Sequence, residues 1–86
     1  MIHKSLREDT FEYYGKEGLS KLNVSDDFKE KLKSNLYKDC ETFSGQRGII
    51  IGVEYCYKYN DCHYIVWIPA FKDVKYESID TCYLFS

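Results

Sequence analysis

The sequence predicts an α+β fold, in which one or two N-terminal helices pack on one face of a three- to four-stranded antiparallel sheet with a long central hairpin. The main observation is the run 48–71, GIIIGVEYCYKYNDCHYIVWIPAF, where β-branched and aromatic residues flank Asn60-Asp61. Such residues favour strands, and an Asx pair tolerates a tight turn. The second observation is a four-residue apolar repeat in the preceding segment, which is typical of a helix with one apolar side.

Composition indicates one small folded unit. The 86 residues are 44% hydrophobic and 17% aromatic, which is enough for a core, so we expect a single domain over residues 1–86. The net charge is −2, and acidic and basic residues are mixed along the chain. This mixture is typical of an ordinary solvated surface and argues against a tail that binds nucleic acid.

The start of the chain and the positions of its cysteines indicate the cellular compartment in which the protein is expected. No apolar stretch resembling a leader follows Met1, and no apolar run approaches the ~20 residues that cross a bilayer. We therefore expect a soluble, cytoplasmic protein with no membrane partner. The four cysteines lie inside apolar runs, which favours free thiols in a reducing compartment. A disulfide framework is the alternative, for a protein exported after removal of a leader.

Two helices are expected before the hairpin. Ser5 can cap a first helix that Gly15 ends, although Thr10–Tyr14 also reads as an extended segment. Residues 15–23 read as a connection. Ser25 is the expected N-cap of a second helix that runs toward Ser44-Gly45, and its apolar stripe consists of Phe28, Leu32 and Leu36.

The hairpin has two unlike faces. With Asn60 and Asp61 as turn residues, Tyr55 faces Val66 across the strands. The face expected to lie under the helix is nearly without charge and carries Ile51, Val53, Tyr55, Tyr57, Tyr59, Cys62, Tyr64, Val66, Ile68 and Ala70. The second face, expected to meet solvent at least near the turn, carries Ile50, Gly52, Glu54, Cys56, Lys58, His63, Ile65, Trp67, Pro69 and Phe71.

Further strands and breaks can be placed around the hairpin. Residues 74–76 and 79–85 both have strand composition, and the second, stronger segment is expected to pair with the hairpin as a third strand. Pro69 belongs at a strand end or on an edge, because it has no N–H group. Gly48 reads as a turn residue, and Gly52 as a bulge or a point of close backbone approach.

Catalytic and metal-binding signatures are not apparent. Cys56, Cys62 and His63 lack the close ligand pairs of a structural zinc site, and the two cysteines point to opposite faces. Cys62 and His63 are adjacent on a strand and cannot share a proton. Cys56 and His63 share a face, but no orienting third group is evident. We therefore expect no cofactor, no metal and no enzymatic activity.

The aromatic sheet also invites comparison with proteins that stack nucleic-acid bases. Phosphate neutralisation supplies much of that affinity, and the two strands and their flanks offer only Arg47, Lys58 and Lys72. Direct nucleic-acid binding is therefore disfavoured.

The second face is the expected binding surface, because aromatic residues supply the anchors of many protein interfaces. A competing interpretation is that Met1–Tyr14 folds over this face and buries Trp67. The expected partner-binding residues are Glu54, Lys58, His63, Ile65, Trp67 and Phe71.

The expected function is that of a small non-enzymatic inhibitor. Examples of this class are a toxin-immunity protein, an antitoxin or a phage-encoded inhibitor of a host defence or nuclease complex, such as an anti-CRISPR protein. A nuclease or nucleoprotein complex is commonly basic, so an acidic partner can meet it by charge complementarity. The alternatives are a small enzyme or ligand-binding module with a tyrosine-lined pocket between helix and sheet, and a homodimer formed through the same face.

Overall fold

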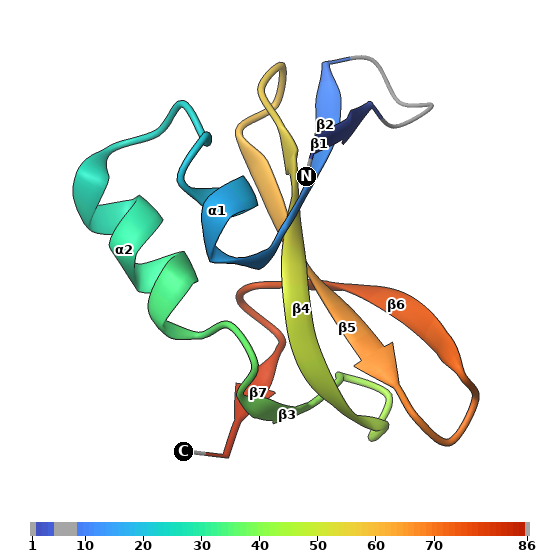
Figure 1. Ribbon diagram of the computed structural model, residues 1–86. Helices are drawn as coiled ribbons and strands as arrows, with labels where there is room; N and C mark the ends of the chain where they lie inside the picture. The colour runs from blue at the N-terminus through green and yellow to red at the C-terminus, as the bar shows by residue number, and fades with distance from the viewer. Residues whose placement is uncertain (1, 5–8, 86) are drawn as a thin grey trace.

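The computed structural model describes residues 2–4 and 9–85, with side chains from residue 9 onward, and places two short helices beside one antiparallel sheet (Figure 1). The elements in chain order are β1 (Ile2–Lys4), β2 (Thr10–Tyr14), α1 (Gly15–Leu19), α2 (Asp26–Ser34), β3 (Asp39–Glu41), β4 (Arg47–Cys56), β5 (Asp61–Ile68), β6 (Asp73–Ser78) and β7 (Tyr83–Leu84). The predicted α+β class and the antiparallel sheet are confirmed, and the described residues form seven strands rather than three or four.

Strand β4 is the centre of the sheet. Its second half pairs with β2, its first half pairs with β3, and β5 runs along its other side. The sheet continues outward through β1 beside β2, β6 beside β5 and β7 beside β3. One long strand therefore joins two smaller groups of strands into a single sheet.

The predicted hairpin is present, but its register differs from the expected one. Tyr55 pairs with Cys62, not with Val66, and the turn occupies residues 57–60. Asn60 adopts a left-handed conformation with φ of 51°, which Asn tolerates better than most residues. The shift moves each pairing by an even number of residues, so the predicted division into two faces survives near the turn.

A β-bulge between Ile50 and Gly52 reverses that division on β4 farther from the turn, while β5 keeps the predicted division. Ile50 pairs with Val66 and is fully buried in the core, whereas Ile51 is the extra residue and is only partly buried. The assignment of Ile51 to the core face and Ile50 to the second face was therefore wrong. The expectation of a bulge or close backbone approach at Gly52 is confirmed: a Cβ there would overlap the carbonyl oxygen of Tyr13.

The core lies between the helices and the β4–β5 hairpin. It consists of Tyr13, Leu19, Leu22, Leu32, Leu36, Cys40, Ile50, Val53, Tyr55, Cys62, Tyr64, Val66 and Ile68. Most hairpin residues expected on the helix side are among them. Tyr59 and Ala70 are not, because Tyr59 lies in the turn and Ala70 lies beyond the end of β5, and both are exposed.

Helix α2 begins where the sequence indicated and ends earlier. The Ser25 hydroxyl accepts a hydrogen bond from the Phe28 N–H at 3.3 Å, as an N-cap should. The helix stops at Ser34 rather than near Ser44-Gly45, and Tyr37 then adopts φ of 67°. This reversal sends the chain into β3, where the Cys40 side chain reaches the core.

The N-terminal region is mostly strand. Thr10–Tyr14 is extended and pairs with β4, so the extended alternative is confirmed there and the helical one was wrong; residues 5–8 lie outside the described part of the chain. The expected connection over 15–23 contains α1, which starts at Gly15 with φ of 70° and buries Leu19. The positive φ explains the glycine at this junction.

The C-terminal ranking of strands was also wrong. The segment 74–76 lies within β6, which is the neighbour of β5, whereas only Tyr83–Leu84 of the segment 79–85 forms a strand, beside β3. Pro69 directly follows the last residue of β5, as expected of a residue without an N–H. Gly48 is not a turn residue but lies inside β4, where a Cβ would overlap the carbonyl oxygen of Trp67.

No helix in the ranges 2–4 and 9–85 is both long enough and apolar enough to cross a bilayer.

Candidate functional site

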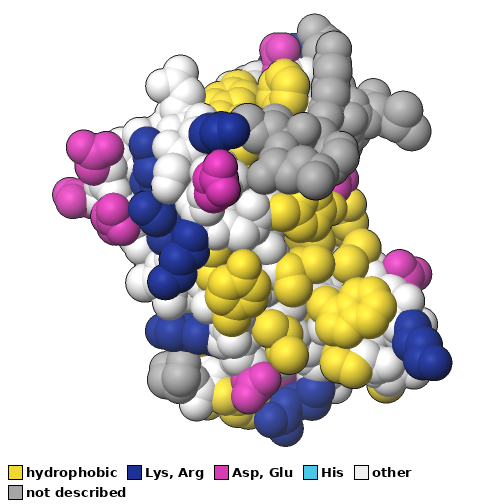
Figure 2. All heavy atoms as spheres, in the orientation of Figure 1, with side chains coloured by type: hydrophobic (Ala, Val, Ile, Leu, Met, Phe, Trp, Pro, Cys, Tyr) yellow, Lys and Arg dark blue, Asp and Glu magenta, His cyan; other side chains and the backbone are white. Residues whose placement is uncertain are grey.

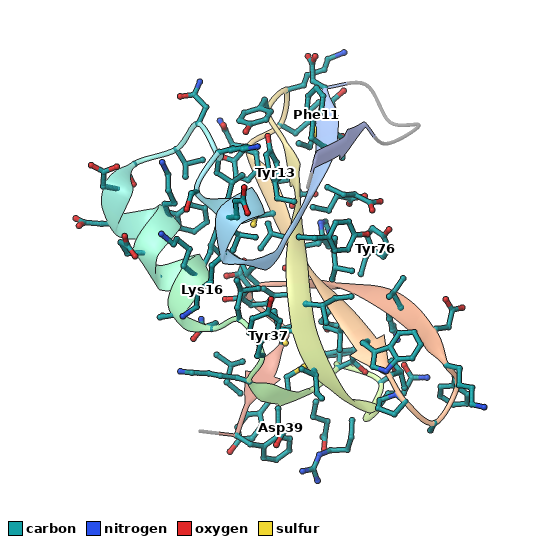
Figure 3. The ribbon with its side chains drawn as sticks, in the orientation of Figure 1. Phe11, Tyr13, Lys16, Tyr37, Asp39 and Tyr76 are labelled. Atoms are coloured by element: carbon teal, nitrogen blue, oxygen red, sulfur yellow. The ribbon has the colours of Figure 1, made fainter. Side chains whose placement is uncertain are left out.

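The candidate site is the sheet face opposite the helices, here called the outer face. Its side chains form successive rows across the strands: Glu12, Glu54, His63 and Ser78; then Tyr14, Gly52, Ile65 and Tyr76; then Ile49, Trp67 and Val74. Figure 3 shows Tyr76 on this side of β4 and Tyr13 on the helix side.

Hydrogen bonds to one carboxylate link residues of the first two rows. The hydroxyls of Tyr14 and Tyr76 each donate to Glu12, at 2.5 Å, and they reach it from β2 and β6. These two strands are separated by β4 and β5 in the sheet, so the contact crosses over the outer face. We call Glu12, Tyr14 and Tyr76 the carboxylate clamp. Ile65, in the row between the two tyrosines, is fully buried.

Acidic residues and a histidine lie beside the clamp. Glu54 pairs with Glu12 across β2 and β4, and its side chain is buried. The imidazole Nδ1 of His63 lies 3.9 Å from a Glu54 carboxylate oxygen and 3.8 Å from an Asp61 carboxylate oxygen. A protonated imidazole at this position would offset negative charge on both carboxylates.

Burial and the carboxylate clamp both raise the pKa of the two tyrosines on the outer face, Tyr14 and Tyr76. Burial raises the pKa of Tyr14 to about 12, and the hydrogen bond to Glu12 adds to the rise. Burial and the same carboxylate raise the pKa of Tyr76 well above the usual tyrosine range. Both phenols therefore stay protonated as hydrogen-bond donors at neutral pH, which suits a structural clamp rather than a general base.

The structure divides the six residues predicted to contact a partner. Glu54 is 7% exposed and Ile65 is fully buried, so neither offers an open contact surface; the expectation that Glu54 would be solvated was wrong. His63 is partly buried, and Lys58 is exposed in the β4–β5 turn. Trp67 is 36% exposed and Phe71 is 64% exposed. The open residues on the β5 side are therefore Trp67 and Phe71.

The third row is apolar; Trp67 is 36% exposed, and Ile49 and Val74 are partly buried. Ile49, Trp67 and Val74 lie side by side on β4, β5 and β6, and Pro69 and Ala70 are exposed just beyond β5. We call these five residues the Trp67 surface. Figure 2 shows hydrophobic side chains gathered over this part of the sheet, with charged side chains around them.

A shallow groove adjoins the Trp67 surface. Its volume is about 330 Å³, and it is lined by Asp39, Arg47, Gly48, Ile49, Pro69 and Ala70. The guanidinium of Arg47 lies 4.1 Å from the centre of the Phe85 ring, which holds this charge at the groove wall. An apolar floor with one acidic and one basic wall residue fits a protein side chain better than a strongly charged ligand.

The described residues of the N-terminal segment, 2–4 and 9–14, do not fold over this face as the competing interpretation expected. Residues 2–4 and 10–14 extend the sheet edgewise as β1 and β2, and Trp67 keeps 36% of its surface exposed.

Several residues of the outer face were not identified from the sequence. Glu12, Tyr14 and Tyr76 were not singled out, because their meeting depends on the curvature of a sheet that spans 64 residues of sequence between Glu12 and Tyr76. Ile49 and Val74 were missed because the bulge and the identity of β6 place them beside Trp67. The extended alternative over Thr10–Tyr14 was the local signal for β2, but it did not indicate which residues the side chains of this strand would meet.

Tyrosines on the helix side have structural partners. The buried Tyr64 hydroxyl accepts a hydrogen bond from the Asn35 amide at 2.8 Å, and the Tyr13 and Tyr57 hydroxyls are 2.6 Å apart. Tyr57 also accepts from the Asn23 N–H at 3.2 Å. The hydroxyls of these tyrosines have hydrogen-bond partners within the layer between helices and sheet, which does not favour a ligand pocket there.

The four cysteines are free thiols, and three of them are buried. Cys56 and Cys62 lie on opposite faces, as the strand alternation predicted, because Cys62 pairs with Tyr55 while Cys56 pairs with Asp61. Within the described part of the chain, no three His, Cys, Asp or Glu side chains are grouped so that they could hold a metal ion.

Comparison with known proteins found no matching family model, no matching curated protein and no matching solved structure.

Proposed function

We propose that this chain is a small non-enzymatic protein that binds a protein partner through the Trp67 surface and thereby inhibits it. The observation that supports the proposal is the apolar row Ile49, Trp67 and Val74, which lies on the side of the sheet away from the helices and leaves Trp67 36% exposed. Aromatic residues with a large contact area at the centre of a patch supply much of the energy of protein interfaces.

The surroundings of this row support the same proposal. Asp39 and Arg47 line the adjoining groove, and Lys72 and Asp73 are exposed near the C-terminal end of β5, where Asp73 pairs with Ile68. A polar rim around an apolar centre is the usual anatomy of a protein interface. The partner class that fits the chain's acidic balance is a basic protein, such as a nuclease or a nucleoprotein complex of a host defence system.

The test uses Trp67→Ala with Tyr59→Ala as the matched control. Tyr59 is also an exposed aromatic residue, 69% exposed, but it lies in the turn at the far end of the hairpin. Each tagged protein captures partners from the native host or its target cell, and the captured protein is then purified for titration. We expect Trp67→Ala to weaken binding at least about tenfold, and Tyr59→Ala to leave it unchanged.

Inhibition is measured on the purified partner with the same three proteins. The wild type and Tyr59→Ala should reduce the partner's activity at equal concentrations, and Trp67→Ala should not. Circular dichroism checks that the Trp67→Ala variant keeps its fold. Equal binding by all three proteins would refute the role of the Trp67 surface, and a sedimentation coefficient that rises with concentration only when Trp67 is intact would assign the surface to a homodimer instead.

A further inference from the structure

The thiols of Cys40 and Cys82 form a pair that plays no part in the proposed function. Cys40 is the middle residue of β3 and is fully buried, and Cys82 packs against the core just before β7. Cys40 pairs with Leu84 across β3 and β7, and Cys82 lies two residues before Leu84, so both side chains pack into the core at the same end of this ladder and each thiol affects the pKa of the other. Two cysteines on the same side of neighbouring segments can be joined by a disulfide if their Cα atoms lie within about 7 Å of each other.

Strand pairing and backbone hydrogen bonds fix the segments that carry the two cysteines. Cys40 pairs with Leu84 across β3 and β7, and the Cys82 N–H donates to the Ser78 carbonyl at 3.1 Å. The Phe85 N–H donates to the Asp39 carbonyl, also at 3.1 Å. The pairing between β3 and β7 is only two residues long, so a covalent link here would add to a short ladder.

We propose that Cys40 and Cys82 form a reversible intramolecular disulfide when the folded protein meets a low-molecular-weight disulfide such as oxidised glutathione. The bond would tie β7 and the C-terminal end of the chain to β3. The proposal concerns a different part of the molecule from the Trp67 surface, and either can fail without the other.

The chemistry balances with one molecule of oxidised glutathione. Cys82 is partly exposed, so its thiolate attacks a glutathione sulfur, releases one glutathione thiolate and leaves a mixed disulfide at Cys82. The Cys40 sulfur then attacks Cys82 Sγ and releases the second glutathione. Two protein S–H bonds are replaced by one S–S bond, and the two electrons and two protons leave in two molecules of reduced glutathione.

Burial of the two thiols should slow this exchange. It raises the pKa of the Cys40 thiol to about 12, and it also raises the pKa of Cys82, where the neighbouring Cys40 thiol opposes the rise. Because the thiolate is the attacking species, oxidation should be slow at neutral pH and should be followed to completion.

The chain contains its own control pair. Cys56 and Cys62 are closer in sequence and lie on paired strands, but their side chains are on opposite faces. In an unfolded chain the short loop between Cys56 and Cys62 closes more easily than the long one between Cys40 and Cys82. Native geometry and chain proximity therefore predict different disulfides.

The experiment incubates the reduced, folded protein with oxidised glutathione, blocks the remaining thiols and maps the linked peptides by mass spectrometry. We expect an intact mass lower by two hydrogens, a Cys40–Cys82 peptide, and free Cys56 and Cys62. The same oxidation in denaturant should give mainly the Cys56–Cys62 link. Stable glutathione adducts alone, a native Cys56–Cys62 link, or no oxidation of the folded protein would each overturn the proposal.

Two variants complete the test. Cys82→Ser should abolish the native disulfide, whereas Cys56→Ser should retain it. Oxidation should raise the melting temperature of Cys56→Ser by roughly 10 °C, and dithiothreitol should reverse the rise. A melting temperature of Cys82→Ser that rises equally on oxidation would contradict the assignment to Cys40 and Cys82.

Discussion

The two faces of the β4–β5 hairpin bury their side chains by different means. The helix side is closed by packing, where leucines of α1, α2 and the segments after them meet Val53, Tyr64 and Val66. On the outer face, hydrogen bonds among Glu12, Tyr14 and Tyr76 cross the row in which Ile65 is fully buried, whereas Trp67 in the next row is 36% exposed. Residues of the same strand, Ile65 and Trp67, thus have opposite exposure although they share a face.

From this difference we expect the helix side to determine the stability of the fold and the outer face to provide the surface for a partner. Removing apolar atoms from the helix side should destabilise the fold, because nothing replaces the lost contacts. Removing them from the row of Trp67 should change the surface available to a partner and little else. The following predictions test that separation, beginning with the helix side.

Leu32→Ala should cause the largest loss of stability. Leu32 is fully buried in the core, and truncation of a buried leucine costs about 2–5 kcal/mol through lost burial and the cavity left behind. Urea unfolding followed by circular dichroism measures the free energy of unfolding. Phe43→Ala, at a residue that is 83% exposed, is the control and should stay within about 0.5 kcal/mol of the wild type. Equal losses for the two variants would refute the assignment of the core.

Gly52→Ala should have the next largest effect, because it tests how closely β2 approaches the bulge. The added Cβ would overlap the Tyr13 carbonyl oxygen, so β2 must move away from β4, at a cost of about 1–3 kcal/mol. Gly45→Asn is the control, since Gly45 has φ of 85° in open space and Asn accepts a left-handed conformation. Urea unfolding compares both with the wild type, and an unchanged midpoint for Gly52→Ala would contradict the close approach.

The smallest expected effect is a pH dependence from the carboxylate clamp. Burial and the hydrogen bond to Glu12 raise the pKa of Tyr14 to about 12 in the folded protein, above the unfolded value of about 10. The folded state therefore favours the protonated phenol, so this contribution to stability is complete below about pH 10 and is lost as the pH rises toward about 12.

Tyr14→Phe isolates this contribution. Below about pH 10 the wild type should be more stable than Tyr14→Phe, and the difference should shrink as the pH rises. Urea unfolding from about pH 9 to about pH 11.5 measures it, with Tyr59→Phe in the exposed turn as the control. A difference between wild type and Tyr14→Phe that stays constant over this range would show that the clamp does not hold Tyr14 protonated.

Local patterns in the sequence were sufficient for several features of the fold. The N-cap at Ser25, the hairpin over residues 47–68, the opposite orientation of Cys56 and Cys62 and the bulge near Gly52 all follow from propensities and periodicities within a few residues. The candidate site was predicted less well. Trp67 and Phe71 were expected on the second face and are exposed, but the same expectation covered Glu54 and Ile65, which are buried.

Tertiary structure decided what local patterns could not. The end of α2 depends on Tyr37 turning the chain so that β3 can reach β4, and the choice of β6 over residues 79–85 as neighbour of β5 depends on pairing across the whole sheet. The amino-acid sequence by itself determined which side chains alternate along each strand, because that alternation is a property of the backbone. Only the folded sheet decided which alternate side chains meet, because curvature and register bring Tyr76 to Glu12 and leave Trp67 in the open.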